Sequence, residues 1–141
     1  MLWGGIEGAG VGPLHRCNGN VNQHVFESIL NSHEEYLIGR TLAQDNAPCH
    51  KTLLIRDWLT IHGIDIMPWP SCSPDLNPIE QVWAVMKRRI QGFRFNSKNH
   101  LWKVLRRMWM KFTPLFVRRF VDSMPNRVAA VISAKGGVTK Y

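Results

Sequence analysis

Two carboxylates in this sequence stand where active-site acids often occur. Asp45 follows a short extended run at residues 40–44, and an acid at the end of a strand lies in the crevice that favours sites in α/β sheets. Glu80 lies in the first turn of a helix expected to begin at Pro78, and 34 residues separate it from Asp45. Two carboxylates from separate elements can share hard divalent cations such as Mg²⁺. A pair of such ions, about 3.5–4 Å apart, stabilises the attacking and leaving oxygens of phosphoryl transfer.

Each acid also has a purely structural explanation. Asn77 and Glu80 have the spacing of a capping box, in which the Glu80 side chain only accepts a backbone N–H at the helix start. Asp45 precedes a proline-containing segment and fits a turn or a helix cap, and Asp75 is typical of a turn. Spacing alone leaves both explanations open for Asp45 and Glu80, and it favours the structural one.

Positive charge is concentrated in the second part of the chain. Residues 81–141 hold fourteen of the 18 Lys and Arg residues beside one acid, Asp122, whereas residues 1–80 hold four bases and nine acids. Such a basic region indicates a polyanionic partner, most often nucleic acid, although a solvated helical face explains the charge equally well. The best candidates for phosphate contacts are clustered bases on expected helices: Lys87, Arg88, Arg89, Arg106, Arg107, Arg118 and Arg119.

Composition argues against several other classes of protein. The 141 residues are 45% hydrophobic, which suffices for one domain with a buried core. No apolar stretch approaches the ~20 residues of a membrane span, so we expect no membrane partner. The first residues also lack the pattern of a secretory signal. Three widely spaced cysteines (Cys17, Cys49 and Cys72) argue against a disulfide framework, and they and the histidines lack zinc-ligand spacing.

The elements that must position these residues form an α/β region in the first part of the chain, followed by a basic region made of helices. Extended runs at residues 1–6 and 12–16 flank a glycine-rich turn and predict a β-hairpin, and short strands are expected at 40–44 and 64–67. Helices are expected where apolar residues recur at three- and four-residue steps: 23–38, 54–62, 78–90, 98–111, 113–123 and 125–134.

The segment before Glu80 has a distinctive composition. Residues 68–78 contain four prolines in eleven positions, which excludes regular structure. Asn77 is the expected N-cap of the following helix, and Pro78 takes the favoured first helical position. Three tryptophans on apolar helix stripes are predicted to lie in the core rather than to stack on bases: Trp58, Trp83 and Trp102.

Two segments resemble the catalytic domain of the Tc/mariner superfamily of cut-and-paste DNA transposases, in its Tc-like branch. They are Gln44-Asp45-Asn46-Ala47-Pro48-Cys49-His50 and Trp69-Pro70-Ser71-Cys72-Ser73-Pro74-Asp75-Leu76-Asn77-Pro78-Ile79-Glu80-Gln81-Val82-Trp83. The 34-residue gap between the acids, the opening residues 3–6 and the ending residues 134–141 also fit. The resemblance therefore covers essentially the whole chain, and it outweighs the structural explanations for both acids.

The resemblance implies a ribonuclease-H-like α/β fold in which three acids bind two Mg²⁺ or Mn²⁺ ions. Water is then activated to cut DNA at transposon ends, and the freed 3′-hydroxyl attacks target DNA. By matching motif, Asp45 is the second acid and Glu80 the third, so both are implied as catalytic and metal-binding residues. The implied partner is DNA, with self-association or pairing with a full-length transposase, and the implied location is the nucleus.

The sequence departs from the family pattern at its start. The family's first strand and first acid precede the Trp-Gly segment at which this chain begins, and Glu7 does not replace that acid by position. We therefore expect residues 1–92 to form a partial ribonuclease-H-like DDE domain lacking its first strand, and residues 93–141 to form its basic helical extension. The expected function is that of a Tc-like transposase fragment for DNA transposition and integration, inactive alone. The alternative is a non-enzymatic DNA-binding relic or a domesticated interaction module.

Overall fold

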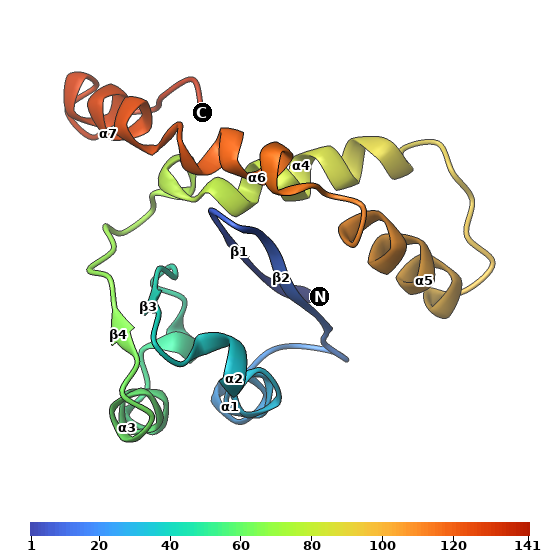
Figure 1. Ribbon diagram of the computed structural model, residues 1–141, viewed down its shortest axis with the longest axis horizontal. Coiled ribbons are helices and arrows are strands. Elements are labelled where there is room, and N and C mark those ends of the chain that lie inside the picture. The colour runs from blue at the N-terminus through green and yellow to red at the C-terminus, as the bar shows by residue number, and fades with distance from the viewer. The chain divides into compact units, whose positions relative to one another are not determined.

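The computed structural model describes all 141 residues. Its helices and strands divide between two compact units, each of which includes part of one β-hairpin (Figure 1). Unit 1 comprises residues 1–3 and 15–73, and unit 2 comprises residues 4–14 and 74–141. The division therefore falls inside the proline-rich loop. The domain boundary expected after Gly92 stays a prediction.

The predicted hairpin is present. Strand β1 (Leu2–Glu7) pairs with β2 (Gly10–Arg16) across a short turn, and Gly10 has a φ of 136°, a conformation that favours glycine. At the open end the N–H of Cys17 donates to the carbonyl oxygen of Met1 at 3.0 Å. The hairpin is a sheet of two strands, so one edge of each strand has no strand partner.

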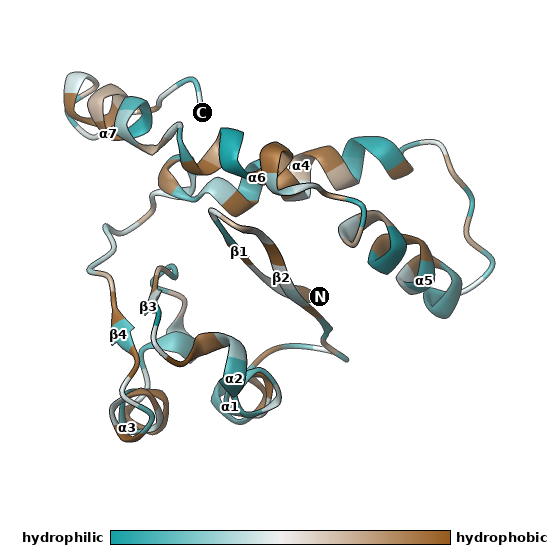
Figure 2. Cartoon of the chain, viewed as in Figure 1, coloured by the Kyte–Doolittle hydropathy of each residue, from teal (hydrophilic) through white to brown (hydrophobic).

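Unit 1 is built around α1 (Gln23–Ser32) and α3 (Leu53–Ile61). Asn22 caps α1 as predicted, since its Oδ1 accepts the N–H of Val25 at 3.0 Å. The indole N–H of Trp58 donates to Oδ1 of Asn31 at 2.6 Å and joins the two helices. Buried side chains from both helices form most of the core: Phe26, Ile29, Leu30, Ile55, Trp58 and Leu59. Figure 2 shows the alternation of apolar and polar residues expected of amphipathic helices.

The single helix expected over residues 23–38 is wrong, because the chain breaks it at His33. This residue has φ −133° and separates α1 from α2 (Glu34–Leu37). Its imidazole stacks on Trp3, with ring centroids 5.3 Å apart, and its Nε2 lies 3.3 Å from Nδ1 of His15. The apolar period nevertheless continues through the break, since Leu37 is buried. Contacts distant in sequence therefore accompany a break that local periodicity does not reveal.

A second small sheet lies in unit 1. Strands β3 (Thr41–Leu42) and β4 (Asp65–Ile66) pair in parallel, with Thr41 opposite Asp65 and Leu42 opposite Ile66. They are shorter than expected but lie within the predicted segments. The short 3-10 helix η1 (Pro48–His50) and then α3 connect them, which gives the helical crossover that parallel pairing requires.

Unit 2 contains the helices of the basic region. The 3-10 helix η2 (Pro74–Leu76) lies in the proline-rich segment, so the expectation of no regular structure there is wrong for these three residues, because proline is tolerated at the first position of a helical turn. Four α-helices follow, and their predicted bounds are confirmed to within two residues at each end: α4 (Pro78–Ile90), α5 (Lys98–Trp109), α6 (Pro114–Val121) and α7 (Met124–Ser133). Side-chain oxygens of three residues cap the first three of these α-helices: Asn77, Ser97 and Thr113. No helix in the chain combines the length and the apolar character that crossing a membrane requires.

Two tryptophans organise the core of unit 2. Trp109 is 1% exposed and stacks on Trp83, with ring centroids 5.1 Å apart. Its indole N–H donates to the carbonyl oxygen of Gly12 at 2.8 Å. A Cβ at Gly4 would lie 3.1 Å from a ring carbon of each tryptophan, which is tighter than ordinary contact, so the close packing favours glycine there. Of the three tryptophans predicted to be core, Trp58 is buried, whereas Trp83 and Trp102 are half-buried.

Candidate active site and nucleic-acid interface

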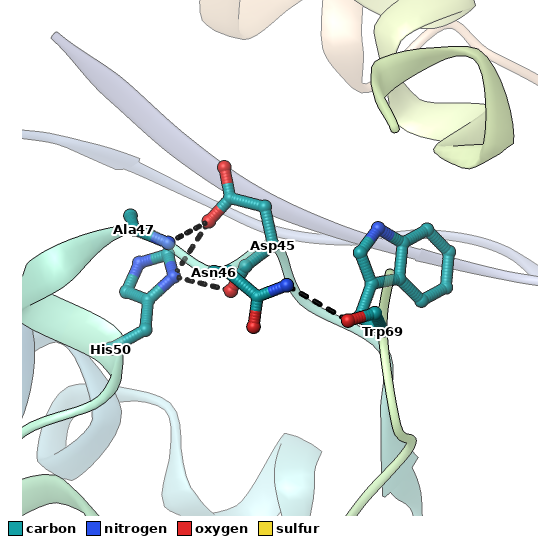
Figure 3. A network of polar contacts seen from close by, with 5 residues as sticks. All are labelled: Asp45, Asn46, Ala47, His50 and Trp69. Carbon is teal, nitrogen blue, oxygen red and sulfur yellow. Dashed lines mark hydrogen bonds and ion pairs between the residues drawn. The ribbon is translucent and has the colours of Figure 1, made fainter. Parts of the chain in front are cut away.

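Asp45 lies in the turn between β3 and η1 (Figure 3). Its Oδ1 accepts the N–H of Ala47 at 3.0 Å, and Nδ1 of His50 lies 2.9 Å from the same oxygen. Nδ1 of His50 also lies 3.3 Å from the carbonyl oxygen of Asp45. The hydrogen bond from Ala47 closes a turn of the kind given above as the structural explanation for Asp45. Together these contacts hold the carboxylate in one orientation.

The second carboxylate oxygen of Asp45 has a different environment. In Figure 3, Oδ2 points away from both Ala47 and His50. The side chain is 62% exposed, which leaves this oxygen accessible to a ligand. Hard divalent cations prefer oxygen ligands of this kind. The donor chemistry at Asp45 therefore fits one ligand of a Mg²⁺ or Mn²⁺ site.

Neighbouring residues support this turn from both sides. The side-chain amide of Asn46 donates to the carbonyl oxygen of Trp69 at 2.8 Å and ties the turn to the proline-rich loop. The imidazole of His50 packs on Phe26, with ring centroids 4.2 Å apart, and Phe26 is 1% exposed. Sequence reasoning missed both supporting roles. The available signal was that Asn46 and His50 belong to the same short motif as Asp45.

Glu80 lies exposed in the first turn of α4, in unit 2. The predicted cap is present, since Oδ1 of Asn77 accepts the N–H of Ile79 at 3.3 Å. The N–H of Glu80 donates to the carbonyl oxygen of Asn77 at 3.2 Å. A carboxylate in the first turn also interacts favourably with the helix dipole. Asp45 and Glu80 belong to different units, so their convergence on one site stays a prediction.

The seven basic candidates share one kind of position. All are exposed, all lie in unit 2, and they occupy the last turns of α4, α5 and α6: Lys87, Arg88, Arg89, Arg106, Arg107, Arg118 and Arg119. The guanidinium of Arg89 also lies 5.3 Å from the ring centroid of Phe112. Cations in a last turn stabilise the helix through its dipole, which is a structural explanation beside phosphate contact.

Other metal-ligating residues stay dispersed. No group of three or more His, Cys, Asp and Glu side chains gathers so as to hold a metal ion. All three cysteines are free. Burial raises the pKa of the Cys17 and Cys49 thiols and so disfavours the thiolate, the form that binds zinc.

Comparison with known proteins gives relatives along the whole chain. Residues 6–102 match the family described as DDE superfamily endonuclease. The chain is 37% identical to the Tcb1 transposase of Caenorhabditis briggsae and 34% identical to the Tc1 transposase of Caenorhabditis elegans. Both alignments cover 100% of this chain and 54% of the relative, so the chain spans about half the length of the curated relatives it matches.

Solved structures of the Mos1 transposase have a similar fold. Its catalytic domain with Raltegravir and Mg matches with a TM-score of 0.90 and 22% identity, covering 99% of this chain and 77% of that chain. The Mos1 paired-end complex with the left transposon end matches with a TM-score of 0.89 and 23% identity, covering 99% and 44%. These matches confirm the predicted fold class, a mixed α/β fold of the ribonuclease-H-like type.

Proposed function

Because the chain belongs to the DDE superfamily endonuclease family, as a transposase of the Tc1/mariner type, we propose that it serves in metal-dependent cutting and joining of DNA. In this proposal Asp45 and Glu80 are catalytic residues that bind the metal. The observation that carries it is the geometry of Asp45, one oxygen of which is held by the turn while the other is exposed. Its position after a strand of an α/β fold is also the one that favours such sites.

Each of the chain's own residues has a distinct part in this chemistry. His50 and the N–H of Ala47 restrain the Asp45 carboxylate, so that Oδ2 is presented without a loss of rotamer freedom on binding. Glu80 supplies a second carboxylate from a capped helix start. Bound Mg²⁺ or Mn²⁺ would offset charge on the reacting phosphate and lower the pKa of the attacking water.

We infer further that the 141 residues do not cut or join DNA by themselves. The chemistry implied by the family uses three acids, and only Asp45 and Glu80 match those positions in this chain. Two carboxylates do not fix two ions in the geometry that in-line displacement requires. Supercoiled plasmid should therefore stay intact with the isolated chain and Mg²⁺ or Mn²⁺. Nicking that disappears in Asp45→Ala would contradict this inference.

A chimaeric transposase tests the proposed function directly. Residues 1–141 would replace the aligned part of the Tcb1 transposase, and excision would be measured on that relative's own transposon ends. We expect metal-dependent excision that Asp45→Ala and Glu80→Ala each abolish. Asp57→Ala is the matched control, because Asp57 is an exposed acid in the same unit as Asp45. Excision that survives both alanine substitutions would refute the assignment.

A second candidate function is DNA binding without chemistry. The observation that favours it is the set of seven exposed bases on the helices of unit 2. It would make DNA the partner of this chain and the nucleus its place of action, which the localisation of a tagged chain would test. Self-association, or pairing with a full-length transposase, is part of the same proposal, in line with the paired-end Mos1 complexes. Light scattering with and without DNA would test it.

A further inference from the structure

Arg127 in α7 is a buried charge with several polar contacts. It is 2% exposed. Its Nε donates to Oγ of Ser123 at 2.8 Å, and its Nη1 donates to the carbonyl oxygen of Asp75 at 2.6 Å. Burial lowers the pKa of Arg127, and Tyr141 and Asp75 oppose that shift. A guanidinium is costly to bury, so these specific bonds must offset its desolvation.

The last residues of the sequence contact the same place. Oγ1 of Thr139 donates to Oδ2 of Asp75 at 2.9 Å, and the N–H of Tyr141 donates to Oγ1 of Thr139 at 3.3 Å. The guanidinium of Arg127 lies 4.7 Å from the ring centroid of Tyr141. We call these five residues the Arg127 network: Asp75, Ser123, Arg127, Thr139 and Tyr141. All of them belong to unit 2.

The Arg127 network lies close in sequence to the start of α4, because a single residue separates Asp75 from Asn77, the N-cap of that helix. Asp75 is the middle residue of η2, and the next residue, Leu76, is buried. The N–H of Asn77 donates to the carbonyl oxygen of Pro74 at 3.0 Å, so η2 passes directly into the cap of α4. Glu80 follows within the first turn. The N–H of Glu80 in turn donates to the carbonyl oxygen of Asn77 at 3.2 Å, so a hydrogen-bonded segment links η2 to the Glu80 backbone.

The contact of Arg127 with a main-chain oxygen is informative. A residue that served only packing could be replaced by an apolar side chain of similar volume at little cost. Arg127 instead donates from Nη1 to the backbone of η2 and from Nε to the hydroxyl of Ser123, while Thr139 donates to the carboxylate of Asp75. The network thus fixes one point of the main chain, five residues before Glu80.

We propose that Arg127 is a positioning residue for Glu80, and that residues 139–141 complete this support. The inference rests on the proposed function, because the place of Glu80 matters to catalysis only if its carboxylate binds metal. Asp75 is then a structural acid that anchors the segment and not a metal ligand.

Amide hydrogen exchange measured by NMR on the 141-residue chain tests the positional claim. Arg127→Met should speed exchange at Asn77, Ile79 and Glu80 by tenfold or more, on the order expected for loss of a charge-assisted hydrogen bond. Thr139→Val should also speed it by roughly tenfold, because the hydroxyl donates to the Asp75 carboxylate and this bond is charge-assisted as well. Arg94→Met is the matched control, because Arg94 is exposed. It should leave these amides unchanged.

Aqueous Mn²⁺ then separates positioning from a general loss of stability. We expect Mn²⁺ to broaden the amide signal of Glu80 in the wild type, and Thr139→Val and Arg127→Met to weaken that broadening. In Arg127→Lys the broadening at Glu80 should stay weaker than in the wild type, although the positive charge is kept. The reason is that an ammonium lacks the planar guanidinium fork.

Each outcome decides a separate question. Unchanged exchange at residues 77–80 in both Arg127→Met and Thr139→Val would overturn the positioning role. If Arg127→Met fails to fold, Thr139→Val alone decides, because it removes only the two hydrogen bonds of one half-buried hydroxyl and leaves the guanidinium in place. If Mn²⁺ broadens neither Asp45 nor Glu80 in the wild type, the proposed function fails, whereas the exchange data still decide the positional claim.

Discussion

The two candidate acids are held in different ways. In unit 1, the contacts of the Asp45 carboxylate come from Ala47 and His50, which lie two and five positions away in the sequence. In unit 2, the segment that leads to Glu80 is anchored by residues 52 and 64 positions from Asp75. The direct contacts of the Asp45 carboxylate thus form within one short motif, although Asn46 and His50 of that motif also contact Trp69 and Phe26. The support of the segment before Glu80 exists only when the whole of unit 2 is folded, so damage far from Glu80 should reach it.

The two units also differ in the composition of their cores and surfaces. Unit 1 buries aliphatic and aromatic side chains between α1 and α3, and Cys17 beside them. Unit 2 buries a stacked tryptophan and Arg127, and it holds all fourteen bases of residues 81–141. Unit 2 therefore combines a strongly charged surface with a core whose large buried groups need specific partners. We expect it to be the more sensitive to substitution.

The largest stability effect should come from Trp109→Ala. Loss of a fully buried indole costs about 3–5 kcal/mol in the free energy of unfolding. Hydrogen exchange should increase throughout unit 2 and much less in α1 and α3. Met110→Ala is the control, because Met110 is 72% exposed and should change little. Equal loss of protection in both units would break the distinction between them.

Next in size is the effect on DNA binding. If the seven exposed bases contact phosphates, the log–log salt slope should be roughly −6, at about −0.9 for each contact. A fourfold variant would change Arg106, Arg107, Arg118 and Arg119 to Gln. Its salt slope should flatten to about −3 without loss of helicity. The control replaces Lys51 and Arg56, exposed bases of unit 1. Equal binding by wild type and the fourfold variant would show that these helices are only solvated.

A smaller loss is expected from Gly4→Ala. The added Cβ would approach ring carbons of Trp83 and Trp109 to 3.1 Å, tighter than ordinary contact. Overpacking of this kind costs about 1–3 kcal/mol in the free energy of unfolding. Gly8→Ala serves as the control, since no heavy atom lies within 4 Å of its added Cβ. Urea denaturation would measure both, and a Gly4→Ala protein as stable as the Gly8→Ala control would refute this packing.

The smallest effect concerns pH and unit 1. Burial, and secondarily the charge of His15, lower the pKa of His33 from 6.5. The unfolded chain therefore takes up a proton that folded His33 resists, and the free energy of unfolding should fall as pH drops below about 6.5. His33→Gln should flatten this dependence between pH 7 and 5, whereas His24→Gln, at an exposed position, should not. A wild type whose stability rises on acidification would contradict the assignment.

Sequence alone predicted the features that depend on near neighbours. The caps Asn22 and Asn77 act within three residues of themselves, and both are confirmed. The break of the helix at His33 was not predicted, because it involves contacts with Trp3 and His15, which are remote in sequence.

The burial of Arg127 was not predicted for a similar reason. In a segment rich in Lys and Arg, nothing local distinguishes a buried guanidinium from a surface charge. Its partner Asp75 lies 52 positions earlier. The motif identified Asp45 and Glu80 as a pair, yet spacing along a chain does not fix a distance in space, so their convergence could not be derived from the residues.

The convergence of Asp45 and Glu80 on one divalent ion is the central claim. Titration of the ¹⁵N-labelled chain with Mn²⁺ tests it most directly, because the paramagnetic ion broadens amide signals near its binding site. We predict that signals of residues 45–46 and 79–81 broaden together at the same Mn²⁺ concentration, and that Asp45→Ala removes the effect at both places. Broadening that persists at Glu80 in Asp45→Ala, or that reaches only one of the two acids in the wild type, would contradict the account.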